Sequence, residues 1–173
     1  MIYWLNGAYG VGKTTVAIRL LPLLRNAHLY DPELVGNGIR DNYPEALFRE
    51  TFEEYPAWLE TNYRVLKDLY ERYDGDIVVP MTLLREASYA AMVQRLRDEG
   101  VPVQYIYLDC DAETLRHRMV DLGREKPDSW CVGHIPICLA VQAAETQAVH
   151  VPTVGRTPEQ IAAQIAALQF RKP

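Results

Sequence analysis

The sequence predicts an α/β fold, with one domain over residues 1–173 built around a mostly parallel β-sheet. Short apolar runs of strand length alternate with longer segments of helical period, a pattern typical of βαβ units. A glycine-rich stretch separates the first apolar run from the first helical segment. A chain of this length can bury about 70% of its unfolded surface, which is enough for one hydrophobic core.

Strand and helix signals follow one another along the chain in the order that such a fold requires. Strands are expected at residues 2–5, 28–30, 77–79, 103–108 and 148–151. Helices are expected from 13 to about 26, over 45–73, from beyond 82 to 99, from 112 to about 122, and from 158 onward. A turn is expected at 31–33 and a lid-like polar segment at 123–129.

Residues with specific backbone preferences mark several of these boundaries. Pro56 should break or kink the segment 45–73, because proline lacks an amide hydrogen and clashes with the preceding turn. Gly100 suits the C-cap of the helix that ends at 99. Asp111 and Thr157 stand where helices open, and Asp111 suits an N-cap because its side-chain oxygen can accept free amides.

Composition and charge exclude several classes of protein. The chain has 18 Lys and Arg against 23 Asp and Glu, a net charge of −5, which argues against a nucleic-acid binder. Three cysteines cannot form a closed disulfide framework and fit a reducing compartment. No apolar run approaches the ~18 residues of a transmembrane helix, and the N-terminus lacks a signal-peptide pattern. A cytoplasmic protein is expected, and its oligomeric state stays open, a homodimer included.

The strongest chemical signal is the segment Gly7-Ala8-Tyr9-Gly10-Val11-Gly12-Lys13-Thr14, which matches G-x-x-x-x-G-K-[ST] at every fixed position. Glycines let successive backbone amides point at one anion, and the helix N-terminus adds partial positive charge. Lys13 supplies a full charge for the outer phosphates, and the Thr14 hydroxyl can ligate Mg²⁺. Thr15 can reach the α-phosphate or simply pack. A glycine-rich turn with a chance lysine is the alternative, but strand, loop and helix all agree with nucleotide binding.

Carboxylates follow the second expected strand, at the sheet edge where ligands bind in open parallel sheets. Asp31 can accept the proton of a phosphoryl acceptor or orient Mg²⁺ through water, and Glu33 is a second candidate. The alternative is that Asp31 only starts a turn with the following proline. Pro80 stands where many nucleotide hydrolases carry an aspartate, which favours a small kinase over a hydrolase or motor.

Basic residues gather on and beyond the helix that follows the fourth strand. Arg118 and Arg124 are the candidates for clamping a transferring phosphoryl group, because a guanidinium can bind it with two parallel hydrogen bonds. A solvated helix face is the alternative. Arg40 and Arg49, in the segment between the second and third strands, could meet a substrate anion. The spacing Cys131-x-x-His134-x-x-x-Cys138 lacks a convincing fourth ligand for a structural zinc site, so packing is favoured.

Four stretches, the first of which contains the phosphate loop, match the motifs of a known family in order over most of the chain. They are Trp4 to Thr14, Tyr30-Asp31-Pro32-Glu33, Tyr55-Pro56-Ala57-Trp58 and Ile77-Val78-Val79-Pro80-Met81-Thr82. Together with Glu113-Thr114-Leu115, Arg118 and Ser129-Trp130, they resemble the ATP-binding tunicamycin-resistance proteins. The phosphate loop is generic, whereas the later stretches are much more specific. Spacing departs from the family between Asp121 and Pro127, the stretch that contains Arg124.

The resemblance implies a three-layer P-loop NTPase fold similar to shikimate, gluconate and nucleoside monophosphate kinases. It implies five parallel strands in the order 2-3-1-4-5, helices on both faces, a lid, and ATP as ligand. The implied output is resistance to tunicamycin, a nucleoside antibiotic bearing uracil, sugars and a fatty acyl chain. Three hypotheses follow: ATP-dependent phosphorylation of the drug, tight binding of the drug without turnover, and phosphorylation of an endogenous metabolite such as a nucleoside, sugar or shikimate-like compound.

Overall fold

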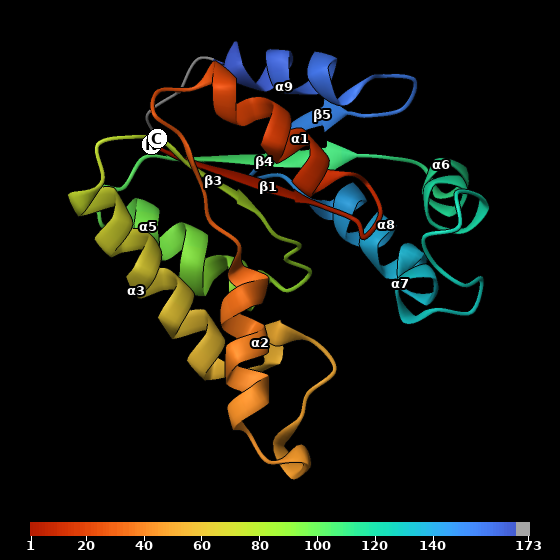
Figure 1. The fold of residues 1–173 in the computed structure, drawn as a ribbon, viewed down its shortest axis with the longest axis horizontal. Helices are drawn as coiled ribbons and strands as arrows, with labels where there is room; N and C mark the ends of the chain where they lie inside the picture. Colours follow the sequence, from red (N-terminus) through yellow and green to blue (C-terminus); the bar gives the residue numbers. More distant parts are fainter. Residues whose placement is uncertain (169–173) are drawn as a thin grey trace.

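The computed structural model describes residues 1–168 and contains one five-stranded sheet (Figure 1). All neighbouring strands are parallel, and their order β2-β3-β1-β4-β5 confirms the predicted 2-3-1-4-5 arrangement. The strands are β1 (Ile2–Gly7), β2 (His28–Leu29), β3 (Ile77–Pro80), β4 (Val103–Asp109) and β5 (Val149–Pro152). Because the strands are parallel, their carboxyl ends meet at one edge, where the phosphate loop and the segment after β2 both begin.

Helices cover both faces of the sheet, as Figure 1 shows: α1 and α9 lie over one face, and α3 and α5 lie over the other. The helices are α1 (Lys13–Leu20), α2 (Pro32–Asn42), α3 (Pro56–Arg72), α4 (Glu86–Tyr89), α5 (Arg95–Asp98), α6 (Ala112–Arg116), α7 (Trp130–Gly133), α8 (Ile135–Ala144) and α9 (Pro158–Ala166). A π-helical segment, Ala90–Gln94, joins α4 to α5, and another, His117–Asp121, extends α6. None of the helices within residues 1–168 is long and apolar enough to cross a membrane.

Two hydrophobic cores follow from the alternation of side chains along the central strand. Leu5 of β1 packs in one core with residues of α1 and α9, such as Val16 and Ile161. Trp4 packs in the other core with residues of α3 and its neighbours, such as Trp58. Because successive strand residues point to opposite faces, one apolar run serves both layers.

Two expected boundaries are corrected by the structure. The first helix ends at Leu20 rather than near 26 and is followed by a 3₁₀ turn over 21–23, because Pro22 cannot donate the next helical hydrogen bond. The expected helix 45–73 is instead two 3₁₀ turns, at 45–47 and 52–54, followed by α3 with Pro56 in its first turn. Proline is favoured there because a first-turn amide has no partner within the helix.

Three helices were not expected from the sequence. The turn placed at 31–33 is the start of α2, with Asp31 as its N-cap and Pro32 in its first turn. Helices α7 and α8 follow the segment interpreted as a lid. The caps expected elsewhere are confirmed: Asp111 accepts from the Thr114 amide at 2.7 Å, Thr157 caps α9, and Gly100 has a φ of 81°.

Candidate active site

The predicted phosphate-binding loop connects β1 to α1, and its backbone requires glycine. Gly7, Gly10 and Gly12 have φ values of 140°, 77° and 104°, in the left-handed region that side chains disfavour. A Cβ added to Gly10 would lie 2.5 Å from Cγ of Met119. Gly12 is the N-cap of α1 and offers no side chain to its free amides. The first turn of α1 therefore presents unpaired donors and the positive end of the helix dipole.

Hydrogen bonds from distant residues hold this loop in place. The buried Asn6 side chain accepts from the Gly7 amide at 2.7 Å and from the Leu83 amide at 2.9 Å. The Thr82 hydroxyl donates to the Gly7 carbonyl at 2.9 Å. Ala8 and Val11, the nonpolar residues within the motif, pack into the core. The loop is therefore preorganised, so that little of its order would have to be gained when an anion binds.

Lys13 occupies the first turn of α1, and its ammonium group turns back over the loop. Its Nζ donates to the carbonyls of Gly7 and Ala8, both at 2.9 Å. Burial lowers the pKa of Lys13 to about 8, because the charged form loses hydration. A desolvated ammonium held by carbonyl dipoles fits the binding of a polyphosphate, which would supply the full negative charge that the site lacks.

Thr14 and Thr15 are exposed on the first turn of α1, beside Lys13. The predicted Mg²⁺ ligands are the Thr14 hydroxyl and, through water, the carboxylate of Asp31. Both are hard oxygen donors, and Mg²⁺ keeps several waters and takes few protein ligands, so this donor set suits the ion. Within residues 1–168 no group of three or more His, Cys, Asp and Glu forms a metal-binding cluster.

Asp31 and Glu33 have different environments at the start of α2. Asp31 accepts the Glu33 amide at 2.9 Å and so caps the helix. Glu33 lies in the first turn of α2, and its carboxyl is partly desolvated. Its pKa is raised by desolvation and by Asp31, and Lys13 opposes the rise. The effect of Lys13 places the Glu33 carboxyl within electrostatic range of the phosphate-loop lysine.

Arg118 lies on the π-helical turn after α6, and its guanidinium is held by the protein itself. Nη1 donates to the Val11 carbonyl at 2.9 Å and to the Thr153 hydroxyl at 3.2 Å, and Nη2 donates to the Thr153 carbonyl at 3.0 Å. These contacts tie the phosphate loop to the loop after β5. The geometry thus gives Arg118 a loop-holding role, and the phosphoryl clamp expected from the sequence stays a prediction.

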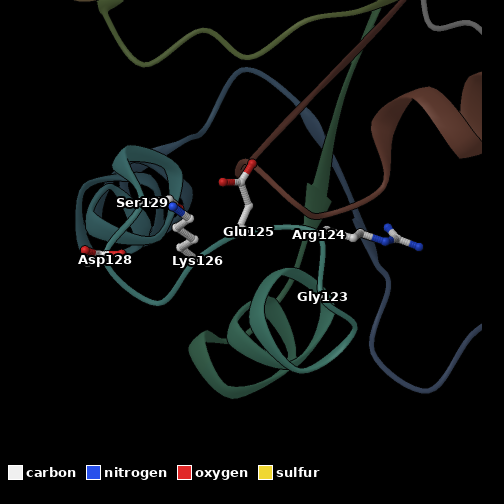
Figure 2. A pocket seen from close by; sticks show the side chains of 6 residues that line it. All are labelled: Gly123, Arg124, Glu125, Lys126, Asp128 and Ser129. Carbon is white, nitrogen blue, oxygen red and sulfur yellow. The ribbon is translucent and has the colours of Figure 1, made fainter.

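Arg124 belongs to a pocket formed by one short segment after α6. Figure 2 shows its lining residues, and the Arg124 side chain points away from those of Glu125 and Lys126. The amides of Arg124 and Glu125 both donate to the Met119 carbonyl, at 3.0 and 2.8 Å. The backbone of this segment is therefore anchored beside Met119, the residue that Gly10 touches.

An aromatic cluster on α7 connects the phosphate loop to the segment before α3. Tyr9 packs edge-on against Trp130 with 5.1 Å between ring centroids, and Trp130 lies 3.7 Å from the His134 ring. The Trp130 indole donates to the Glu50 carboxylate at 2.6 Å. Glu53, in the same segment, is buried and accepts the amides of residues 84 and 85, at 2.9 and 3.1 Å. Sequence reasoning did not single out Glu50 or Glu53, because neither stands in a motif.

A comparison of the sequence with known families shows to which family the chain belongs. A profile described as "AAA domain" matches residues 2–129, about three quarters of the chain. The chain belongs to this AAA-domain family. It is a P-loop protein, and the family implies nucleotide binding at the loop. A search of curated proteins returned no match.

Solved structures place this AAA domain among kinase-like folds. The Deinococcus radiodurans tunicamycin resistance protein superposes with a TM-score of 0.80 at 26% identity, over 99% of this chain and 98% of that one. This likeness confirms the resemblance inferred from the sequence. A gluconokinase from Sinorhizobium meliloti 1021 matches with a TM-score of 0.64 at 16% identity, covering 95% and 89% of the chains. Shikimate kinase from Aquifex aeolicus vf5 matches with 0.56 at 19%, covering 95% and 93%. The last two establish the fold alone.

Asp109 and the Cys131–Cys138 segment of this AAA domain both have ordinary structural partners. Asp109, at the end of β4, lies 2.8 Å from Nδ1 of His150. In the Cys131–Cys138 segment, Nδ1 of His134 lies 2.8 Å from the Trp130 carbonyl, and Cys138 is buried. These contacts account for both groups without a role in binding nucleotide.

Proposed function

We propose that this AAA-domain protein is a small-molecule kinase, which transfers the terminal phosphoryl group of ATP to a hydroxyl group of its acceptor. The observation that carries the proposal is the position of Glu33 in the first turn of α2, at the carboxyl edge of the sheet and within electrostatic range of Lys13. A phosphate loop alone supports many activities, but a carboxyl close to the loop is what transfer to an acceptor hydroxyl requires.

In this proposal each group at the site has one task. The loop amides of residues 7–15 and the Lys13 ammonium bind the polyphosphate. The Thr14 hydroxyl and, through water, the Asp31 carboxylate would hold Mg²⁺, which when bound neutralises charge on the phosphates. Glu33 accepts the hydroxyl proton as the acceptor oxygen bonds to phosphorus and the bond to the departing ADP breaks. Its raised pKa moves it toward the working range of a general base at neutral pH.

Tunicamycin is the first acceptor to test, because a tunicamycin resistance protein shares the fold over nearly its whole length. The purified protein is incubated with Mg²⁺, ATP and tunicamycin, and the drug is analysed by mass spectrometry. Drug that gains one phosphoryl group with the wild type, and none with Lys13→Ala, would support the proposal. Calorimetry, combined with this assay, distinguishes phosphorylation of the drug from tight binding without turnover. Tight, ATP-dependent drug binding in calorimetry, with an unchanged drug mass, would contradict transfer to tunicamycin.

An endogenous metabolite is a second candidate acceptor, and a separate observation favours it. The Arg40 guanidinium, on α2, donates to the Arg49 carbonyl at 3.3 Å, and neither arginine forms a salt bridge among residues 1–168, so their charges are available to a negatively charged metabolite. Unchanged tunicamycin sensitivity in cells that overproduce the protein would favour this candidate over the drug.

A further inference from the structure

We propose that Trp130 and Glu50 form a subsite for an uncharged ring of the acceptor, a sugar ring or a nucleobase, whose hydroxyl or N–H groups donate to the Glu50 carboxylate. The inference rests on the proposed kinase activity, because it concerns the part of the same acceptor that lies beside the phosphate loop. It adds a substrate class, which neither the phosphate loop nor the fold specifies.

A short series of contacts places this subsite next to the phosphate loop. Nζ of Lys13 lies 5.7 Å from the centre of the Tyr9 ring, and the centroids of the Tyr9 and Trp130 rings are 5.1 Å apart. Burial raises the pKa of Tyr9, and nearby acidic groups that include Glu53 and Glu33 add to the rise. Trp130 therefore lies one ring away from the lysine that is expected to bind the outer phosphates. The carboxyl that is proposed to accept the hydroxyl proton is within electrostatic range of the same tyrosine.

The Trp130 side chain offers aromatic surface that the protein leaves uncovered. Its exposed fraction is 38%, whereas Trp4 and Trp58 are completely buried in the core. The Trp130 ring centroid lies 3.7 Å from that of His134, and Nδ1 of His134 lies 2.8 Å from the Trp130 carbonyl. These contacts hold the indole in place, so that little conformational entropy is lost when a ligand packs against it. Aromatic side chains of this kind bind flat rings by stacking.

The Glu50 carboxylate lies at the edge of the indole and has an oxygen available to a ligand. Oε1 accepts the Trp130 indole N–H at 2.6 Å, and the Glu50 side chain is 62% exposed. Among residues 1–168 no group donates a hydrogen bond to Oε2, and the basic nitrogen within 4 Å of this carboxylate is Nε2 of His134, at 3.7 Å from Oε1. An ionised carboxylate only accepts hydrogen bonds, so Oε2 suits an O–H or N–H group of the ligand.

The charge of Glu50 limits the class of ligand. A phosphate or carboxylate attached to the bound ring would lie close to the Glu50 carboxylate, and like charges at short range repel each other. The cation nearest to the ring cluster is Lys13, whose charge is expected to be matched by the polyphosphate when nucleotide is bound. An uncharged ring that carries its own donors fits the aromatic surface and the carboxylate together.

The segment that carries Glu50 is held against the sheet before a ligand arrives. The amides of Glu50 and Thr51 donate to Oε2 of Glu54 at 3.0 and 3.1 Å. The Glu53 carboxylate accepts the amides of residues 84 and 85, which follow β3, at 2.9 and 3.1 Å. The segment is therefore anchored beyond the carboxyl end of β3, at the sheet edge where ligands bind in open parallel sheets.

The test uses the full chain with Mg²⁺ and a non-hydrolysable ATP analogue bound at the phosphate loop. Binding of the analogue is measured first, because its failure would count against the proposed function alone. Uridine and, separately, glucose are then titrated, and binding is followed by calorimetry. We expect saturable binding of at least one of them to the wild type. Binding of uridine alone would assign the subsite to a nucleobase, and binding of glucose would assign it to a sugar ring.

Fluorescence and substitutions locate the bound ring. Because Trp4 and Trp58 are buried, acrylamide quenching of tryptophan fluorescence reports mainly on Trp130, and a bound probe should reduce the quenching. Affinity should fall about tenfold in Trp130→Leu and in Glu50→Ala. Glu50→Gln keeps an acceptor for the indole and should bind with intermediate affinity. Rings that carry a carboxylate, glucuronate in place of glucose and orotidine in place of uridine, should bind more weakly than the uncharged probes.

Tyr70→Leu and Glu71→Ala are the matched controls, because both residues are exposed near the end of α3 that leads to the amino end of β3. Both variants should bind the probes like the wild type. Thermal unfolding without ligand checks that each variant folds. No saturable binding of either probe to the wild type, or binding that leaves the quenching of Trp130 unchanged, would overturn the proposal. Equal affinities in the wild type, Trp130→Leu and Glu50→Ala, or tighter binding of the carboxylated rings, would overturn it as well.

Discussion

Arg118 donates a 2.9 Å hydrogen bond to the carbonyl oxygen of Val11, a residue 107 positions earlier in the chain and inside the phosphate loop. The same guanidinium makes two hydrogen bonds to Thr153 in the loop after β5. One side chain therefore joins the two loops at the carboxyl edge of the sheet. Its nitrogen atoms donate to protein oxygen atoms on both loops, and a lysine could not form these hydrogen bonds with the same geometry.

Replacing Arg118 should weaken nucleotide binding more than it slows chemistry. Arg118→Met removes three hydrogen bonds to oxygen atoms and leaves the Val11 carbonyl without this partner, so we expect unfolding to become easier by about 2–4 kcal/mol. The dissociation constant for ATP should rise about tenfold. Denaturant unfolding and fluorescent-nucleotide binding measure the two effects, with the exposed Arg116→Met as control. A large fall in kcat with unchanged ATP affinity would instead show that Arg118 clamps the phosphoryl group.

The lowered pKa of Lys13 predicts a pH dependence of nucleotide binding. Folding lowers this pKa from 10.5 to about 8, so the ammonium loses its proton in the folded protein as pH rises through 8. Between pH 8 and 10.5 the unfolded chain binds more protons at Lys13 than the folded protein does. The free-energy cost of burying this side chain therefore decreases as the pH rises. A nucleotide favours the ammonium form, so ATP affinity should fall above pH 8.

Calorimetry at pH 8.5 in two buffers of different ionisation enthalpy provides the measurement. We expect proton uptake when the wild type binds ATP, and less uptake in Lys13→Met. Identical proton uptake in the two proteins would assign the linkage to another group.

The phosphate loop could be predicted from the sequence because its chemistry is local. Glycines, lysine and threonine at fixed spacing determine both the backbone path and the anion site. The residues that hold the loop could not be found in this way. Thr82 donates to the Gly7 carbonyl from 75 positions away, and Asn6 accepts the amide of Leu83 from 77 positions away. Such pairs come together only when β1 and β3 are neighbours in the sheet.

The missed helix α2 shows how packing can outweigh local preference. Gly36 and Gly38 each disfavour a helix by about 1 kcal/mol, and the Asp31-Pro32 pair is equally typical of a turn. In the structure a side chain at Gly36 would overlap the Phe52 ring, and the Trp58 indole donates to the Pro32 carbonyl at 2.9 Å. These contacts lie outside any local window. Helix α8 was missed because its residues are nearly all apolar, which leaves no helical period to detect.

Substitutions of the two carboxylates at the start of α2 should separate their roles. Glu33→Gln should lower kcat about 10²- to 10⁴-fold with ATP affinity nearly unchanged, because it removes the group that accepts the hydroxyl proton. Asp31→Ala should cost about 1 kcal/mol of stability through loss of the N-cap, whereas Asp31→Asn should keep the cap. Steady-state kinetics with the identified acceptor and thermal unfolding measure these effects. Full activity in Glu33→Gln together with inactive Asp31→Asn would reverse the assignment.

The hydrogen bond between Trp130 and Glu50 predicts a specific effect on the acceptor. Trp130→Phe keeps an aromatic ring beside Tyr9 and His134 but removes the indole donor that holds Glu50, the residue next to Arg49. We expect the KM for the acceptor to rise, with a change in ATP affinity below about twofold and in stability below about 1.5 kcal/mol, because this hydrogen bond is exposed. Glu50→Gln is the matched control, since its side-chain carbonyl can still accept the indole, and its KM should stay closer to the wild type. A rise in the KM for ATP alone would show that α7 acts on the phosphate loop through Tyr9 rather than on the acceptor segment.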